Sequence, residues 1–292
     1  MKQAMKQALL ILSGNESEKL PSLVKQFDER FNIYIHIDKK MEVSDNIILS
    51  LKRFINVKRI SRLFITNWGS MNIVNAILHL CTEALYDNEN SHFHLISGAD
   101  YPIKSNDYIF KTFNSEEDNY INYFRLPTPY WEGGGYNRLL LFHPLDSLNI
   151  KNLQERAKYI KFVEYQIHNN IEREPLNIPY YGGSTWWSLS RGCIEYIVKN
   201  KDAYNLYQRM HDTFAPDEMF VQTLLANSPY RPHLKNNNLR FIKWEYQNGN
   251  IPANLDLSDL NNIIGSNNLF MRKVDKACSI DLVKEITSRR NP

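Results

Sequence analysis

Cysteine is scarce in this chain of 292 residues, which contains only Cys81, Cys193 and Cys278. The number is odd and the spacing is wide, so neither a disulfide framework nor a cysteine-ligated zinc cluster is expected. Long apolar runs are also lacking, because segment 8–13 is too short to cross a membrane or to form the core of a signal peptide. The sequence therefore predicts a protein of a reducing compartment, located in the cytoplasm.

Several motifs of nucleotide and metal chemistry are missing as well. The chain has no G-x-G-x-x-G and no Walker loop, which removes support for dinucleotide and ATP chemistry. It has no D-x-D triplet, the carboxylate pair with which nucleotide-sugar enzymes usually hold a divalent metal. His92 and His94 alternate on an expected strand and are interpreted as packing or surface residues. We therefore expect no bound metal and no cofactor.

Charge is not concentrated in any long run. The formal net charge is +3, without a basic stripe interleaved with aromatic residues, so no nucleic-acid partner is expected. An anionic small molecule, or peripheral contact with a mildly anionic membrane surface, is compatible with this charge. The 17 tyrosines and 14 phenylalanines suit a carbohydrate site, where flat rings pack on sugars, and suit an aromatic core equally well.

Apolar strands and helices alternate along the first part of the chain. Segments 8–13, 32–38 and 92–97 have the composition of buried strands, and 18–30 and 71–85 are expected to be helices. This alternation predicts an α/β fold with a parallel or mixed sheet and helices on both of its faces.

One domain is expected over residues 1–292, because the chain contains no repeat and no low-complexity linker. Its first half, 1–125, is interpreted as mainly nucleotide-binding, and 126–292 as mainly acceptor-binding and catalytic. In the second half a helix is expected over 152–170 and a strand over 239–246.

Charged or glycine-marked turns follow the expected strands at 36–39, 67–70 and 97–102. In sheets of this kind ligands bind beyond the carboxyl ends of the strands. An Asp in such a place is often only a turn former. Together the three turns outline a rim that could hold a nucleotide, with Trp68 available to pack on a flat group.

The run APDEMFVQTLL, residues 215–225, predicts a helix over 216–226 that begins with a proline and two acids. Glu218 would stand at the mouth of this helix, which is a suitable place for a general base. The structural alternative is that Asp217 and Glu218 only complement the positive end of the helix dipole. Further along, the adjacent cations Arg272 and Lys273 could neutralise a diphosphate or could form a solvated basic turn.

Taken together, these runs resemble one family of enzymes. The family is that of the core-2/I-branching β-1,6-N-acetylglucosaminyltransferases and peptide O-xylosyltransferases, glycosyltransferase family 14. The matching pieces, in family order, are IYIHIDKK (33–40), NWGS (67–70), HLISGADYPIKS (94–105), GGSTWWSLSR (182–191), APDEMFVQTLL (215–225), FIKWEY (241–246) and LFMRKVD (269–275). The segment 126–180 matches poorly and is expected to shape the choice of acceptor.

The resemblance implies a GT-A-type, Rossmann-like nucleotide-sugar-binding domain with a mixed central sheet flanked by helices. It also implies an inverting, metal-independent transfer from a UDP-sugar. The acid of the family's PDE run is the catalytic base, which falls on Glu218, and the lysine of its LF-x-x-K run holds the diphosphate, which falls on Lys273. Many members have a second basic residue a little upstream, but the corresponding stretch here, 251–259, has no Arg or Lys. Either Arg272 substitutes for it, or the diphosphate is held less tightly.

The remaining site residues follow from the same resemblance or from the poorly matched loop. The resemblance places the donor and its nucleotide against His36, Asp38, Trp68 and Asp100. It implies an acceptor side lined by Trp244 and Tyr246. Glu132 and Arg138, in the poorly matched loop, are candidates for binding acceptor hydroxyls.

The function expected from the sequence is sugar transfer, with GlcNAc or xylose favoured, from a UDP-sugar to a glycan or lipid-linked saccharide. Because the chain lacks the anchor and the many cysteines of animal members, we expect a bacterial relative that builds surface polysaccharide. Two alternatives remain open. The chain could be a glycoside hydrolase using Asp217 and Glu218, or a non-catalytic protein that binds sugars or nucleotides.

Overall fold

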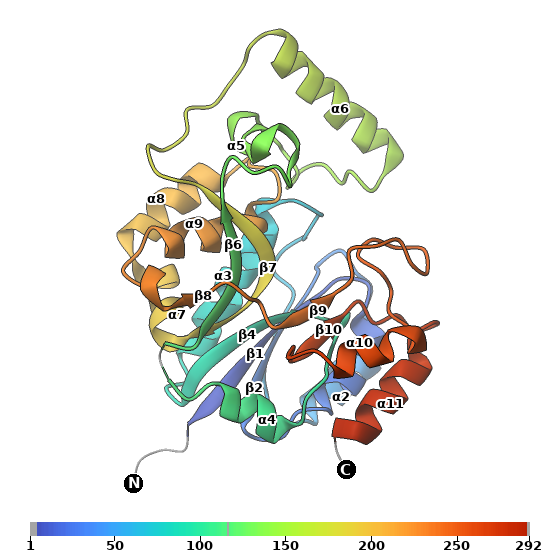
Figure 1. The fold of residues 1–292 in the computed structure, drawn as a ribbon. Coiled ribbons are helices and arrows are strands. Elements are labelled where there is room, and N and C mark those ends of the chain that lie inside the picture. The colour runs from blue at the N-terminus through green and yellow to red at the C-terminus, as the bar shows by residue number, and fades with distance from the viewer. Residues whose placement is uncertain (1–4, 116, 291–292) are drawn as a thin grey trace.

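The computed structural model describes residues 5–115 and 117–290. Its centre is a seven-stranded sheet in the order β3-β2-β1-β4-β7-β6-β8, and a second, three-stranded sheet has the order β5-β10-β9 (Figure 1). The strands are β1 Lys6–Ser13, β2 Phe31–Ile37, β3 Val57–Ser61, β4 Asn90–Ser97, β5 Asp100–Pro102, β6 Asn119–Arg125, β7 Tyr181–Ser190, β8 Leu234–Lys235, β9 Arg240–Ile242 and β10 Phe270–Arg272.

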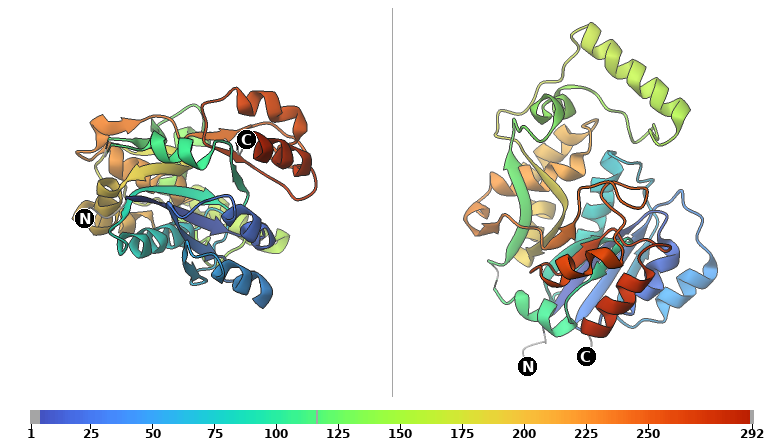
Figure 2. Two further views of the ribbon diagram at one scale, coloured as in Figure 1. Left: turned by 90° about the horizontal axis from the view of Figure 1, so that it is seen from below. Right: turned by 45° about the vertical axis from the view of Figure 1, so that its right-hand side comes forward.

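Helices cover both faces of the large sheet (Figure 2). The α-helices are α1 Leu20–Val24, α2 Asp45–Lys52, α3 Met71–Leu85, α4 Asn106–Thr112, α5 Asn137–Leu140, α6 Leu153–His168, α7 Arg191–Lys199, α8 Lys201–Met210, α9 Phe220–Ala226, α10 Leu260–Ile264 and α11 Ile280–Arg290. The 3-10 helices are η1 Ser17–Lys19, η2 Glu132–Gly135, η3 Pro216–Glu218, η4 Arg231–His233 and η5 Leu257–Asp259.

The apolar composition of β1 reflects burial on both of its faces. Ala8 and Leu10 pack with α3, α7, α8 and α9 in one hydrophobic core. Leu9 and Ile11 point the other way, into a second core with α1, α2, α11 and the small sheet. A strand covered on both sides needs a continuous apolar run rather than an alternating one, and this explains segment 8–13.

The sheet is mixed, as expected. Strands β1, β2, β3 and β4 run parallel to one another, whereas β7 is antiparallel to both β4 and β6. The predicted fold class, an α/β domain with a mixed central sheet flanked by helices, is therefore confirmed. The expected helix over 71–85 is α3, and the helix expected over 152–170 is α6.

Two expected elements are shorter than their sequence pattern indicated. The strand expected over 239–246 ends at Ile242, because the chain then enters an exposed loop in which Trp244 and Tyr246 lie mostly in solvent. The helix expected over 18–30 is reduced to η1 and α1 and ends at Val24. The chain must turn after this point to enter β2 at Phe31, and tertiary demands of this kind override local periodicity.

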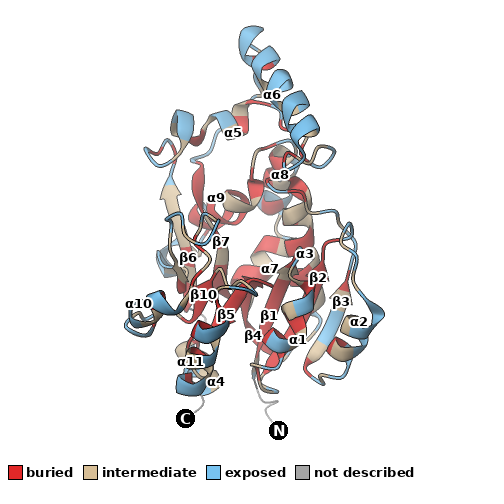
Figure 3. Ribbon diagram, turned by 90° about the vertical axis from the view of Figure 1, so that its right-hand side faces the viewer, coloured by how far each residue is buried: buried red, intermediate tan, exposed pale blue. Residues whose placement is uncertain are grey.

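Helix α6 stands apart from the body of the molecule at the end of long connecting segments (Figure 1). Most of its surface is exposed, in contrast to α3 and α9, which are largely buried (Figure 3). None of the helices in the described part of the chain is both long and apolar enough to cross a membrane.

Candidate active site

The predicted rim turns come together at the carboxyl ends of the parallel strands. The backbone N–H of Asp38, just after β2, donates to the carbonyl of Ser13 at the end of β1 over 2.8 Å. The N–H of Gly98, just after β4, donates to the carbonyl of Leu12 over 2.9 Å. The ends of three neighbouring strands are thus tied into one edge, where ligands of such sheets bind.

Asp38 and His36 hold the next segment of chain against this edge. Both side chains are buried. The carboxylate of Asp38 accepts from the hydroxyl of Thr66 over 2.9 Å and forms an ion pair with Lys40 at 3.1 Å. His36 accepts from the backbone N–H of Phe64 over 3.1 Å, and burial lowers the pKa of its imidazole to about 4. His36 is therefore neutral at physiological pH and shapes the wall of the site.

Trp68 lies on the turn that meets the candidate base. Its side chain is 52% exposed and packs edge-to-face on Phe214, with the ring centroids 5.3 Å apart. The carbonyl of the next residue, Gly69, accepts from the N–H of Ala215 over 2.9 Å. Gly69 has φ +77°, a conformation that glycine adopts without strain. The tryptophan turn and the segment leading to Glu218 are consequently held together.

The segment that carries Glu218 is not the start of a single helix, so the expected helix over 216–226 is wrong at its beginning. Residues Pro216–Glu218 form the 3-10 turn η3, and α9 starts only at Phe220. Between them Met219 has non-helical backbone angles and a fully buried side chain, which breaks the helical path. The first turn of α9 contains no acidic residue. Asp217 and Glu218 thus precede the N-cap of α9 and do not form its first turn.

Glu218 is held by a cation from the poorly matched loop. Its Oε2 accepts from Nη1 of Arg138 over 2.7 Å, and the two side chains are 32% and 20% exposed. The Arg138 guanidinium lies 3.5 Å from the centre of the Trp131 ring, a cation–π contact that fixes its orientation. The sequence identified both partners of this ion pair but not the pairing, because they are 80 residues apart.

Trp131 is a component of the site that the sequence reasoning missed. A Cβ atom placed on Gly182 would lie 2.3 Å from the Trp131 ring, so only glycine leaves room for the indole. The signal was available in the paired glycines of the run 182–191. Glu132, the next residue, is exposed in η2.

Asp217 and Glu218 have different surroundings although they are neighbours. The Oδ2 of Asp217 accepts from the hydroxyl of Thr185 over 2.7 Å. Its Oδ1 is buried and has no hydrogen-bond partner among the described residues. Burial, together with the charge of Glu218, raises the pKa of Asp217 to about 7. Asp217 therefore holds η3 against β7 through its hydrogen bond with Thr185.

The two expected cations also differ from each other. Arg272 is buried on β10, 4.0 Å from the centre of the Trp186 ring, and its Nη1 lies 3.4 Å from Oδ1 of Asp100. Asp100 in turn accepts from both the N–H and the hydroxyl of Ser97, each over 2.9 Å. Lys273 is half-buried, and burial together with the charge of Arg272 lowers the pKa of its ammonium.

Strand β7 contacts both Asp217, the neighbour of the candidate base, and the cation Arg272. Its antiparallel pairing sets Ser188 opposite His94 of β4, which carries Thr185 and Trp186 towards the carboxyl end of β4. Thr185 supports Asp217, and Trp186 lies against Arg272. The sequence reasoning did not single out these two adjacent residues.

The expected acceptor residues Trp244 and Tyr246 lie in the loop after β9, 69% and 74% exposed. Exposed aromatic rings of this kind are available to pack against sugars. In the described part of the chain, no three His, Cys, Asp or Glu side chains gather closely enough to hold a metal ion. Metal independence stays a prediction.

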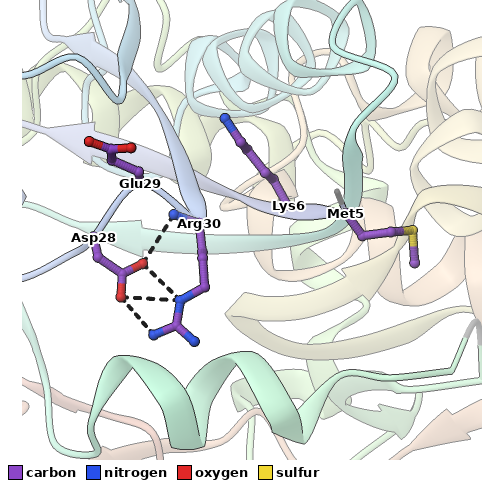
Figure 4. Close-up of a pocket in the computed structure, with 5 residues that line it drawn as sticks. All are labelled: Met5, Lys6, Asp28, Glu29 and Arg30. Carbon is purple, nitrogen blue, oxygen red and sulfur yellow. Dashed lines mark hydrogen bonds and ion pairs between the residues drawn. The ribbon is translucent and has the colours of Figure 1, made fainter. Parts of the chain in front are cut away.

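A hollow of about 460 Å³ at the opposite end of the strands is not a candidate site (Figure 4). It lies beside Met5 and Lys6 and residues 28–30, at the amino ends of β1 and β2. Arg30 and Asp28 form an ion pair at 2.7 Å within it, so their charges already satisfy each other.

Comparison with known proteins identifies the class of this chain. A family model described as "Branch: Core-2/I-Branching enzyme" matches residues 8–264. Xylosyltransferase 1 of Rattus norvegicus is 27% identical over 250 residues, which cover 82% of this chain and 28% of that protein. Xylosyltransferase 2 of Canis lupus familiaris is 28% identical over 253 residues, covering 82% and 27%. The chain thus spans about a quarter of the length of these curated relatives.

A solved structure titled "WbbM bifunctional glycosytransferase apo structure" matches 99% of this chain and 52% of its own, with 10% identity and a TM-score of 0.40. That likeness is too distant to add to the argument. The family match, by contrast, covers most of the chain. The chain belongs to the core-2/I-branching enzyme family of glycosyltransferases, and the family expected from its sequence is confirmed.

Proposed function

We propose that this chain transfers a sugar from a UDP-sugar to a glycan hydroxyl, with inversion at the anomeric carbon and without a metal ion. Inversion by direct displacement needs one base for the acceptor proton and positive charge for the leaving diphosphate. The observation that carries the proposal is that β7 contacts both Asp217, the neighbour of Glu218, through Thr185 and the cation Arg272 through Trp186.

Glu218 is the proposed base. The ion pair with Arg138 engages the ionised carboxylate, which is the form a base needs. Only Oε2 takes part in that ion pair, so Oε1 can accept the proton of the acceptor hydroxyl. Arg138, fixed on Trp131, would hold the carboxylate in one orientation. Positioning of a base within hydrogen-bond reach of its proton is the first requirement of general base catalysis.

Lys273 and Arg272 are the proposed groups that stabilise the departing UDP. Burial beside a second cation disfavours the charged form of Lys273, as the lowered pKa of its ammonium indicates. A bound diphosphate would supply the missing negative charge, which favours the protonated amine. Asp100 would align Arg272 while leaving Lys273 for the ligand.

The other candidate residues are assigned to a donor side and an acceptor side. His36, Asp38 and Trp68 would border the nucleotide, and Asp100 would lie near the donor sugar and phosphate. The acceptor would meet Trp244 and Tyr246, with Glu132 and Arg138 from the poorly matched loop. Xylose is favoured as donor sugar by the names of the curated relatives, and N-acetylglucosamine is the other donor sugar that the sequence resemblance favours. We propose a cytoplasmic bacterial enzyme, acting on surface glycan or lipid-linked saccharide.

The hydrolase alternative has less support than the transferase. A glycosidase needs two carboxylates that face each other across a bond. Asp217 is bonded to Thr185 and Glu218 to Arg138, so each of the two neighbouring carboxylates is already engaged by a different partner. A non-catalytic binding protein would not need a carboxylate held by a stacked arginine at the edge of the sheet.

Incubation with UDP-sugars and a panel of glycan acceptors tests the proposal. A transferase releases UDP faster when the correct acceptor is present. A hydrolase shortens a glycan without any nucleotide, and a binding protein does neither. Product analysis then shows whether the anomeric configuration has been inverted. Retention, or cleavage of glycan without nucleotide, would contradict the proposed reaction.

A further inference from the structure

We propose that α6 and the turn before it form a docking surface for an anionic lipid membrane. The surface, called here the α6 face, consists of residues 151–168 and stands apart from both cores (Figures 1 and 3). Because it concerns binding and not chemistry, the proposal holds whatever sugar the enzyme transfers.

The first observation is the exposure of large apolar side chains. Leu153, Ile160 and Ile167 are 76%, 46% and 60% exposed, and they recur every seven residues. This spacing aligns them along one side of the helix. Phe162 and Tyr165 are also exposed, on a different side of the helix. Clusters of exposed apolar residues of this kind mark sites of interaction.

The second observation is the way in which α6 is attached. The hydroxyl of Tyr159 is hydrogen-bonded to Nδ1 of His143 over 2.7 Å. The amide of Gln166 bonds to both the N–H and the carbonyl of Phe142, over 2.7 and 3.0 Å. Gln166 is the one fully buried residue among the described residues of α6. Polar contacts therefore fix the inner side of the helix and leave its apolar stripe available.

The third observation is charge. Four exposed basic residues belong to the α6 face: Lys151, Arg156, Lys158 and Lys161. Residues 151–168 contain four Lys or Arg against two Glu, a surplus of +2 within a chain whose formal net charge is +3. Of the two acids, Glu155 is turned inward and accepts from the N–H of Asn149 over 2.5 Å. The α6 face as a whole therefore carries a net positive charge.

An anionic lipid surface complements this combination better than a second copy of the chain does. Lysine stems can lie along apolar surface while their ammonium groups reach the headgroups. Two copies meeting through the α6 face would bring like charges together, which opposes their association. The face is also linked to the proposed base, because His143 packs on Phe214 and Phe214 lies beside Arg138. A docked protein would therefore work close to the membrane surface.

Vesicle co-sedimentation of the full chain tests the proposal. Binding is expected to vesicles of phosphatidylcholine mixed with phosphatidylglycerol, and not to phosphatidylcholine alone. It should weaken as salt is raised, since screening shortens the range of the attraction. Each basic residue near an anionic surface is worth roughly fivefold in binding. The double variant Lys158→Gln/Lys161→Gln is therefore expected to bind roughly 30-fold more weakly.

Matched variants distinguish binding through the α6 face from non-specific hydrophobic binding to vesicles. The apolar variant Leu153→Gln/Ile160→Gln/Ile167→Gln should lose most binding. Ile55, which is 75% exposed in another part of the chain, supplies the control Ile55→Gln, which should bind like the unmodified protein. Glu164→Gln, which removes an exposed acid, should bind more tightly.

Three results would overturn the proposal. The first is an absence of binding to anionic vesicles by the unmodified protein. The second is equal binding by the unmodified protein and the double lysine variant, which decides the matter even if the apolar variant does not fold. The third is a dimer of the unmodified protein, measured by light scattering, that becomes a monomer in the apolar variant, together with no binding of the unmodified protein to vesicles. That last result would assign the α6 face to a second copy of the chain.

Discussion

Replacement of Glu218 by Gln is the perturbation that most directly tests the proposed mechanism. The amide has nearly the shape of the carboxylate, and its oxygen can still accept the hydrogen bond from Arg138 that now measures 2.7 Å. It cannot accept the proton of the acceptor hydroxyl. Turnover is therefore expected to fall roughly 10²–10⁴-fold, the usual contribution of a positioned base.

The effect of this substitution on stability should be small. The two side chains of the ion pair are 32% and 20% exposed, and ion pairs with this much solvent contact contribute about 1 kcal/mol or less. In a protein of this size such a loss lowers the melting temperature by about 4 °C at most. UDP affinity should change little, because the cations proposed to bind the diphosphate belong to a different part of the chain, near β10.

Initial rates of UDP release with a verified donor and acceptor, together with melting curves and UDP titrations, provide the measurement. Glu195→Gln is the matched control, because Glu195 forms a comparable ion pair with Arg191 on α7, with side chains 40% and 22% exposed. It should cost similar stability without loss of turnover. Asp217→Asn should also keep more activity than Glu218→Gln. Near-normal transfer by the Glu218→Gln variant would refute the reasoning.

Three further outcomes are expected. UDP should raise the melting temperature more than GDP or CMP, and a larger shift with GDP would contradict the proposed donor. Activity should survive EDTA, and Lys273→Ala should weaken UDP binding by about 1.5–3 kcal/mol in a calorimetric titration; loss of turnover in EDTA that manganese restores would contradict the role of Lys273. The pKa of Asp217 is raised in the folded state from 3.8 to about 7, so this carboxyl lowers stability as pH rises between those values. In urea unfolding, the Asp217→Asn variant should gain more free energy of unfolding over the unmodified protein at pH 8 than at pH 5. An equal gain in stability at both pH values would contradict the assigned burial of Asp217.

Local patterns in the sequence predicted the fold class because the order of strands and helices follows from the spacing of apolar residues within each segment. The apolar run of β1 indicates a strand buried on both faces, and the apolar spacing of 71–85 defines α3. The same reasoning failed where tertiary contacts decide the backbone. Helix α9 starts later than its periodicity indicated, since Met219 is buried and the chain at Ala215 has φ +50°. A positive φ at alanine is costly and exists only where the surrounding structure enforces it.

The sequence by itself determined the α/β class, the rim turns after the strands, and the identity of Glu218, Arg272 and Lys273 as candidate charged groups. Only the tertiary structure decided how these groups are arranged. The pairing of Arg138 with Glu218 depends on the path of a loop 80 residues away, and the contacts of β7 with Asp217 and Arg272 depend on the register of β7 against β4. Neither is encoded in a local pattern, because side chains distant in sequence meet only when the whole sheet and its loops have been assembled.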